Sequence, residues 1–315
     1  MIARHERVPS DFASLSQMQP SDVAQSAGSS RAASLRSSRR VFRFAWYGVN
    51  IVLSLSLIAL IWSMAWEYST QRYLKGFSDA IVPFSAQPVQ KVQAILNWMS
   101  HTPQRFGQAP SSYDDDRDPT ETLNYASLLK VCGTATNAFI NLADSGGLTV
   151  RRLLLLDGNR STVHVVAEVL VNNRWIVVDP TYRTIFRGPD GATLTSSQLV
   201  APAVFRFATQ NVAGYEPTYV FDHAVHIRFA QLGPLGRVLR NLMGVPGWEG
   251  VPFLSLILER KSLEVTILFS FLVFFLLFFR FFLRWYGEKR LGIRTTRLRE
   301  KMRRVSDLLL EPAAD

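Results

Sequence analysis

The chain has a single cysteine, Cys132, among its 315 residues. One cysteine excludes an intramolecular disulfide as a source of stability. It also argues against a dithiol redox centre, because no second thiol is present to resolve a mixed disulfide. No internal repeat is evident at periods of roughly 20 to 50 residues, which argues against a repeat architecture. The thiol is therefore either a small apolar packing group or a nucleophile.

The middle of the chain has almost no excess of positive charge, although the formal net charge is +10. Residues 1–43 carry seven Arg against three acids, and residues 280–315 carry ten Lys and Arg against five acids. Residues 67–264 carry eighteen basic and seventeen acidic side chains. Basic ends that flank apolar segments are typical of membrane topology, so we expect no nucleic-acid partner.

The first long apolar run covers residues 44–66, which include no charged side chain and have Trp and Tyr near both ends. At about 1.5 Å per residue such a helix spans a bilayer, and the aromatic rings suit its interfaces. A secretory signal is the competing interpretation, because Ser63-Met64-Ala65 resembles a cleavage site. The polar leader of residues 1–43, expected to be disordered, favours an uncleaved anchor.

A second transmembrane helix is predicted over residues 264–284, with Arg280 and Arg284 reaching the headgroups at its end. The positive-inside rule places both termini in the cytoplasm and residues 67–263 across the membrane, which in a bacterium is the periplasm. The basic tail, 285–315, either contacts anionic membrane lipids or forms a solvated helix. The apolar stretch 251–258 is expected to lie on the membrane surface or to pack on the exported domain.

Two amphipathic helices are predicted in the exported part. Residues 87–99 place their apolar side chains on one face, and Pro103 ends the helix. The second begins at Cys132 and is stopped by Gly146-Gly147. A thiol at a helix start faces exposed N–H groups and the positive end of the dipole, which lower its pKa and offer donors to an oxyanion.

Three strands are predicted at residues 150–156, 163–171 and 174–179. If Asn172-Asn173 forms a two-residue turn, the second hairpin pairs 171 with 174, 169 with 176 and 166 with 179. In that register His164 and Asp179 lie on the same face as diagonal neighbours, within reach of each other's side chains. A shift by one residue would place them on opposite faces.

Cys132, His164 and Asp179 follow the order nucleophile, base and orienting carboxylate that nucleophilic catalysis requires. Each has a structural alternative: a cysteine is often a buried apolar group, a strand histidine a satisfied polar group, and an aspartate before proline a turn former. Their common order and expected common face favour catalysis. The hypothesis is that these three residues form a catalytic triad.

The same stretch resembles the transglutaminase-like superfamily over about residues 86–187. The resemblance depends on Cys132 at a helix start, Gly followed by Arg151 or Arg152, strand His164 with Glu168 downstream, and Trp175 four residues before Asp179-Pro180-Thr181. It implies an α+β, papain-like core in which the helix bearing Cys132 packs on an antiparallel sheet bearing His164 and Asp179, here between two transmembrane helices. It also implies Cys132 as nucleophile, His164 as base and Asp179 as orienter.

The leading hypothesis is a membrane-anchored enzyme that forms an acyl-enzyme on an envelope amide or ester, then transfers the acyl group to water or an amine. Substrates of this kind are peptides, proteins or an acylated glycan, and the resemblance suggests surface-polysaccharide assembly as a context. The alternative is an inactive scaffold that binds another membrane or envelope protein. No cofactor or metal is predicted. Asp222, His223 and His226 are a possible metal cluster, but the histidine pair lacks a third strong ligand nearby. Residues 221–242 also suit an amphipathic helix near the membrane, within the membrane-proximal region 200–262.

Overall fold

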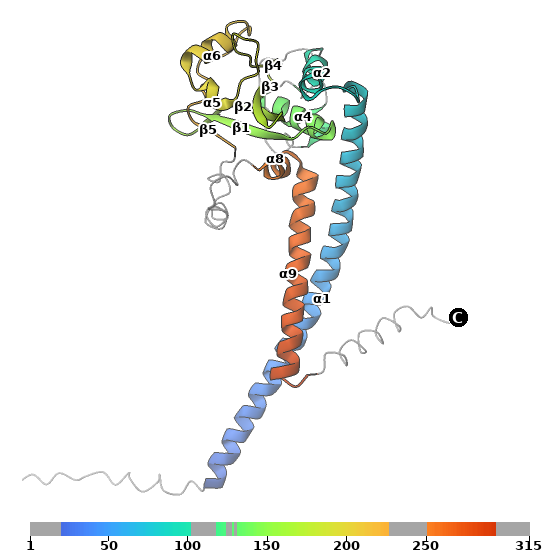
Figure 1. Ribbon diagram of the computed structural model, residues 1–315. Helices are drawn as coiled ribbons and strands as arrows, with labels where there is room; N and C mark the ends of the chain where they lie inside the picture. The colour runs from blue at the N-terminus through green and yellow to red at the C-terminus, as the bar shows by residue number, and fades with distance from the viewer. Residues whose placement is uncertain (1–19, 102–117, 124–127, 129–130, 227–250, 294–315) are drawn as a thin grey trace, which may run out of the picture. The chain divides into compact units, whose positions relative to one another are not determined.

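The structure is a computed structural model that describes residues 20–101, 118–123, 128, 131–226 and 251–293 (Figure 1). The chain divides into two compact units, residues 1–58 with 270–315 and residues 59–269. The second unit contains a five-stranded antiparallel sheet in the order β4-β3-β2-β1-β5. The predicted α+β class, with helices packed on an antiparallel sheet, is confirmed.

The helices and strands have the following bounds. The helices are α1 Pro20–Ile81, α2 Pro88–Ser100, α3 Pro119–Thr122, α4 Cys132–Ser145, α5 Ser196–Leu199, α6 Pro202–Thr209, α8 Pro252–Glu259 and α9 Lys261–Arg290. The strands are β1 Val150–Leu156, β2 Thr162–Val171, β3 Arg174–Asp179, β4 Thr184–Ile185 and β5 Ala224–Val225. β4 and β5, of two residues each, are too short to leave a periodic pattern, and the sequence did not predict them.

The β2–β3 hairpin has the predicted register. Asn172 and Asn173 both have positive φ, at 48° and 60°, as a two-residue hairpin turn requires. The pairs 171–174 and 169–176 are observed, and the ladder continues to Ala167 opposite Val178. His164 and Asp179 therefore lie on the same face of the sheet.

α4 packs against the opposite face of the sheet from His164. Its predicted apolar face is fully buried and joins α2, Val150 of β1 and alternate residues of β2 and β3 in one core. The Thr136 hydroxyl donates to the carbonyl of Val165 at 3.0 Å, which ties α4 to β2 one residue after His164. Gly146 caps the helix and Gly147 has a φ of 78°, as predicted.

The other face of the sheet has its own apolar core. Leu153, Leu155, Val166 and Val177 point into it from the three long strands. Phe186 after β4, Leu199 of α5, Phe205 of α6 and Phe221 before β5 cover them. The central strands are thus buried on both faces.

α1 is much longer than the predicted transmembrane segment. It runs from Pro20 to Ile81, so residues 20–43, predicted to be disordered, are helical in the structure. No proline occurs between Pro20 and Pro83, and a helix nucleated in the apolar segment propagates into flanking residues of adequate propensity. Residues 1–19 of the predicted leader lie outside the described part of the chain.

Two helical segments, Ser38–Ile81 within α1 and Lys261–Arg290 of α9, are long and apolar enough to cross a membrane. Within the first unit, Phe42, Trp46, Leu283 and Leu291 form a buried cluster. The guanidinium of Arg280 lies 5.6 Å from the centre of the Trp46 ring, in cation–π geometry.

α8 corresponds to the apolar stretch 251–258, for which two positions were predicted. Leu256 packs against the α4 core, and the Ser255 hydroxyl accepts from the backbone N–H of Arg152 at 2.7 Å. α8 therefore packs on the sheet domain, next to β1 (Figure 1).

Candidate active site

Cys132 is the first residue of α4, as predicted. Val131 precedes it in extended conformation, at φ −142° and ψ 163°, so the chain turns sharply into the helix at the thiol. The side chain packs partly against Leu154, Leu156 and Val165, next to a register shift between Leu155 and Leu156. The thiol is half-buried, and the positive end of the 14-residue helix lies beneath it.

His164 and Asp179 are hydrogen-bonded, with 2.7 Å between Nε2 and Oδ2. His164 is 1% exposed and Asp179 is fully buried. The other carboxylate oxygen of Asp179 accepts from the backbone N–H groups of Thr181 and Tyr182, at 3.0 and 3.2 Å. The turn after β3 therefore orients the carboxylate, and the carboxylate orients the imidazole.

The Nδ1 atom of His164 is the nitrogen left for the thiol, because Nε2 is bound to Asp179 and Nδ1 has no hydrogen-bond partner among the described residues. Burial by itself would raise the pKa of Cys132. The hydrogen bond and charge of His164, the backbone N–H of Val165 and the charge of Arg152 outweigh burial and lower the pKa of the thiol. All three predicted residues thus come together at the start of α4.

The imidazole has a complementary shift. Burial favours the neutral ring, but the charge and hydrogen bond of Asp179, followed by the interaction with Cys132, raise the pKa of His164 to about 9. A lowered thiol pKa beside a raised imidazole pKa favours a thiolate–imidazolium pair. This pair is the reactive form of a cysteine nucleophile.

Three tyrosines surround His164, and sequence reasoning did not find them. The Tyr219 ring stacks on the imidazole with centroids 4.1 Å apart and planes inclined by 1°. Tyr182 and Tyr215 meet the imidazole edge-on. Burial, then the charge of Asp179, raises the pKa of Tyr215, whose hydroxyl faces that carboxylate. The stacked ring restricts rotation of His164 and shields it from water.

Glu168 organises a second polar cluster on the same face of β2. It is fully buried and accepts from Arg151 Nε at 2.7 Å and from the Ser196 hydroxyl at 2.7 Å. His226 Nε2 lies 2.9 Å from Oε2, the same oxygen that accepts from Arg151, whereas Ser196 binds Oε1. His226, considered in the sequence as one of a possible metal cluster, is thus a hydrogen-bond partner of Glu168. Among the described residues, no three His, Cys, Asp or Glu side chains are grouped to hold a metal.

Arg152 and Glu259 also lie at the site. Arg152 Nη1 donates to Glu259 Oε1 at 2.7 Å, and the charge of Arg152 contributes to lowering the pKa of Cys132. The resemblance left Arg151 and Arg152 undistinguished. The only signal for Glu259 in the sequence was the charged run 259–261 between two apolar stretches.

The arrangement can generate a thiolate, orient its base and exclude water from one side of the imidazole. Residues 75–180 match the model of the family described as the transglutaminase-like superfamily. This match contains all three predicted site residues. No curated protein matches the chain, and no solved structure matches it.

Proposed function

Because residues 75–180 form a transglutaminase-like domain, we propose that this chain is a membrane-anchored cysteine enzyme that works through an acyl-enzyme. The observation that carries the proposal is the 2.7 Å bond between His164 and Asp179, beside a thiol at the start of α4 whose pKa the imidazole lowers. A packing cysteine needs no oriented imidazole, whereas a nucleophile does.

The reaction begins with attack of the Cys132 sulfur on the carbonyl carbon of an amide or ester. The carbonyl oxygen becomes an oxyanion, which the N–H groups of the first turn of α4 can stabilise. The His164 imidazolium donates its proton to the leaving amine or alcohol as the bond to carbon breaks, leaving a thioester on Cys132. Water or an amine then attacks the thioester, giving its proton to His164, and the thiolate is released.

The cellular setting is also part of the proposal. The two apolar helices leave large side chains exposed, including Ile51, Leu55, Phe271 and Phe274, and lipid is the environment that such surfaces require. With both basic ends in the cytoplasm, the domain acts outside a bacterial inner membrane on envelope peptides, proteins or an acylated glycan. A role in surface-polysaccharide or cell-envelope assembly fits that location.

The catalytic proposal is tested with a thiol-directed acyl probe on the full-length protein in detergent. Wild type is expected to form a thioester on Cys132, whereas Cys132→Ala and His164→Ala are not. Absence of labelling above Cys132→Ala at every pH from about 5 to 9 would overturn the enzyme proposal. The close cover of His164 by Tyr219 would then favour the inactive scaffold of a membrane complex.

The topology is tested separately with reporters that are active only outside the cytoplasm. A fusion after Glu249 is expected to be active and a fusion after Asp315 silent. The reverse pattern would place the domain in the cytoplasm and refute the orientation.

A further inference from the structure

The side chain of Arg152 extends from β1 to the first turn of α4. Its Nη2 atom would lie 3.8 Å from a Cβ placed on Gly133, the residue next to the candidate nucleophile. Its backbone N–H is held by Ser255 of α8, and Nη1 by Glu259 at the end of α8. The position of this guanidinium beside Cys132 is therefore determined by the segment before α9.

Glu259 is 1% exposed, and each of its carboxylate oxygens has a donor. Arg152 Nη1 donates to Oε1 at 2.7 Å, and Asn137 Nδ2 of α4 donates to Oε2 at 2.9 Å. Asn137 Nδ2 also lies 2.6 Å from the Glu259 carbonyl oxygen. Glu259 thus connects Arg152 to the helix that carries the nucleophile.

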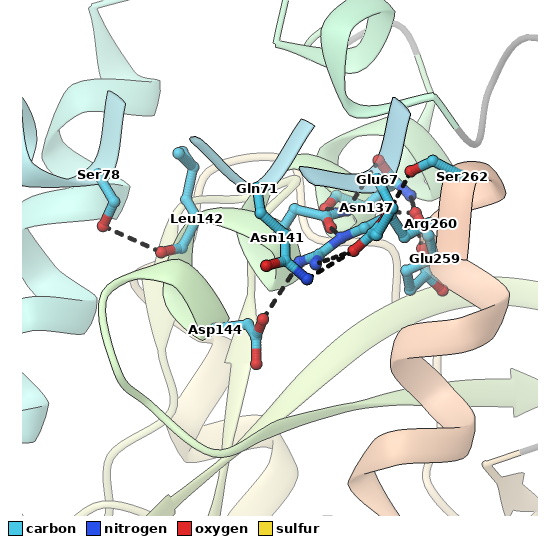
Figure 2. A network of polar contacts seen from close by, with 10 residues as sticks. All are labelled: Glu67, Gln71, Ser78, Asn137, Asn141, Leu142, Asp144, Glu259, Arg260 and Ser262. Atoms are coloured by element: carbon cyan, nitrogen blue, oxygen red, sulfur yellow. Dashed lines mark hydrogen bonds and ion pairs between the residues drawn. The ribbon is translucent and has the colours of Figure 1, made fainter. Parts of the chain in front are cut away.

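The neighbouring residue Arg260 anchors this junction (Figure 2). It is 2% exposed and donates to Asn141 and Asp144 of α4 and to Glu67 of α1, at 3.0, 3.1 and 3.1 Å. Ser262 at the start of α9 donates to the second oxygen of Glu67 at 2.6 Å. The junction between α8 and α9 is consequently fixed to α1 and α4 by charged hydrogen bonds.

We propose that Arg152 is a positioning residue for the Cys132 thiolate and that Glu259 holds it in place, so that the α8–α9 junction completes the active site. The inference rests on the proposed function and deepens it. Glu259 lies outside residues 75–180, the part of the chain that matches the family. The junction at the start of a candidate membrane helix therefore sets the reactivity of the nucleophile.

The physical reason is the fixed charge. A guanidinium beside the thiol favours the charged thiolate, and it remains protonated at every pH at which the enzyme works. Glu259 binds Nη1 of Arg152, whereas Nη2 is the atom nearest to Gly133. Its carboxylate therefore orients the guanidinium without replacing the group that faces the first turn of α4.

The test measures alkylation of Cys132 by iodoacetamide, because Cys132 is the single cysteine of the chain. The alkylation rate of the full-length protein in lipid nanodiscs is measured from pH 5 to 10. Arg152→Gln is expected to slow alkylation by about threefold or more near pH 6 and to match wild type near pH 10. Arg152→Lys should restore part of the rate. Arg151→Gln is the matched control and should leave the profile unchanged.

Glu259→Gln decides between two roles by the sign of its effect. The amide has no charge and one acceptor oxygen where a carboxylate now binds two donors, from Arg152 and Asn137, so it holds the guanidinium less firmly. If Glu259 holds Arg152, the variant releases the guanidinium and slows alkylation near pH 6, and adding Arg152→Gln has no further effect. If the Glu259 carboxylate only offset the positive charge of Arg152, its removal would strengthen the effect of Arg152 on the thiolate. The variant would then speed alkylation, and this result would overturn the proposal.

Different results would overturn the proposed role of Arg152 and the proposed acyl-enzyme function. An unchanged alkylation profile for Arg152→Gln, with circular dichroism showing a folded protein, overturns the inference whatever the acyl probe shows. If Arg152→Gln does not fold, the direction of the Glu259→Gln effect decides. Loss of acyl-probe labelling in wild type overturns the proposed function but leaves the alkylation result valid.

Discussion

Arg151 and Arg152 are neighbours on β1, and each forms a 2.7 Å ion pair with a buried glutamate on opposite faces of the strand. The partner of Arg151 is Glu168, its register neighbour on β2. The partner of Arg152 is Glu259, more than a hundred residues later in the chain. One pair is a product of strand pairing, and the other exists only because α8 returns to the sheet.

The surroundings of the two ion pairs indicate different roles for them. Arg151 also stacks on Trp175, with its guanidinium carbon 3.9 Å from the ring centre, and Glu168 has Ser196 and His226 as further partners. This cluster joins β1, β2, β3 and α5 and stabilises the sheet. The Arg152 pair adjoins the thiol, so it is the one that influences chemistry. Four predictions test this division, beginning with the largest effect.

Asp179→Asn is expected to reduce acyl transfer by about 10³- to 10⁴-fold with little change in stability. The amide can donate to Nε2 of His164, which moves the ring proton to Nδ1 and leaves no acceptor for the thiol proton. The measurement is the rate of thioester formation with the acyl probe. A rate within about tenfold of wild type would remove Asp179 from the mechanism.

Glu168→Ala is expected to lower the free energy of unfolding by about 3 kcal/mol, because it leaves Arg151 without its buried carboxylate. Urea denaturation followed by tryptophan fluorescence measures the loss. The alkylation profile of Cys132 should not move, since neither Glu168 nor Arg151 is among the groups that shift the pKa of the thiol. A small loss of stability together with slower alkylation of Cys132 would contradict this prediction. Glu168, and not Glu259, would then be the glutamate that affects the thiol.

The pH profile of acylation should have a basic limb near pH 9, above which the rate falls about tenfold per unit as the imidazolium loses its proton. The acid limb should lie below the usual pKa of a thiol, because the pKa of Cys132 is lowered. Arg152→Gln is expected to move the acid limb upwards and leave the basic limb in place. Movement of the basic limb alone would mean that Arg152 acts on His164.

Asp144→Asn should have the smallest effect, a stability loss below about 1 kcal/mol. Its side chain is 37% exposed, whereas that of Glu67, which binds the same guanidinium, is 8% exposed. Burial raises the pKa of Asp144 and Arg260 only partly opposes this, so its ion pair contributes less. Thermal unfolding of Asp144→Asn beside Glu67→Gln checks the order, and a larger loss for Asp144→Asn would contradict it.

Much of the sheet domain was predictable because its signals are local. The Asn-Asn turn sets the β2–β3 register, and that register places His164 and Asp179 on one face. The start of α4 at Cys132 and its end at Gly146 follow from a helical apolar face and a glycine stop. The helix α1 continues beyond the predicted membrane segment 44–66 at both ends, because a helix propagates into flanking residues past the point where its apolar core ends.

The sequence by itself determined the three residues of the candidate site, the strands that carry two of them, and two helices apolar enough to span a membrane. Only the tertiary structure decided that Tyr219 stacks on His164, that His226 pairs with Glu168, and that Arg152 differs from Arg151 by reaching Glu259. Periodicity and turn chemistry act over a few residues. The contacts that complete the site join β1, α4 and the α8–α9 junction, which only the packing of the whole domain brings together.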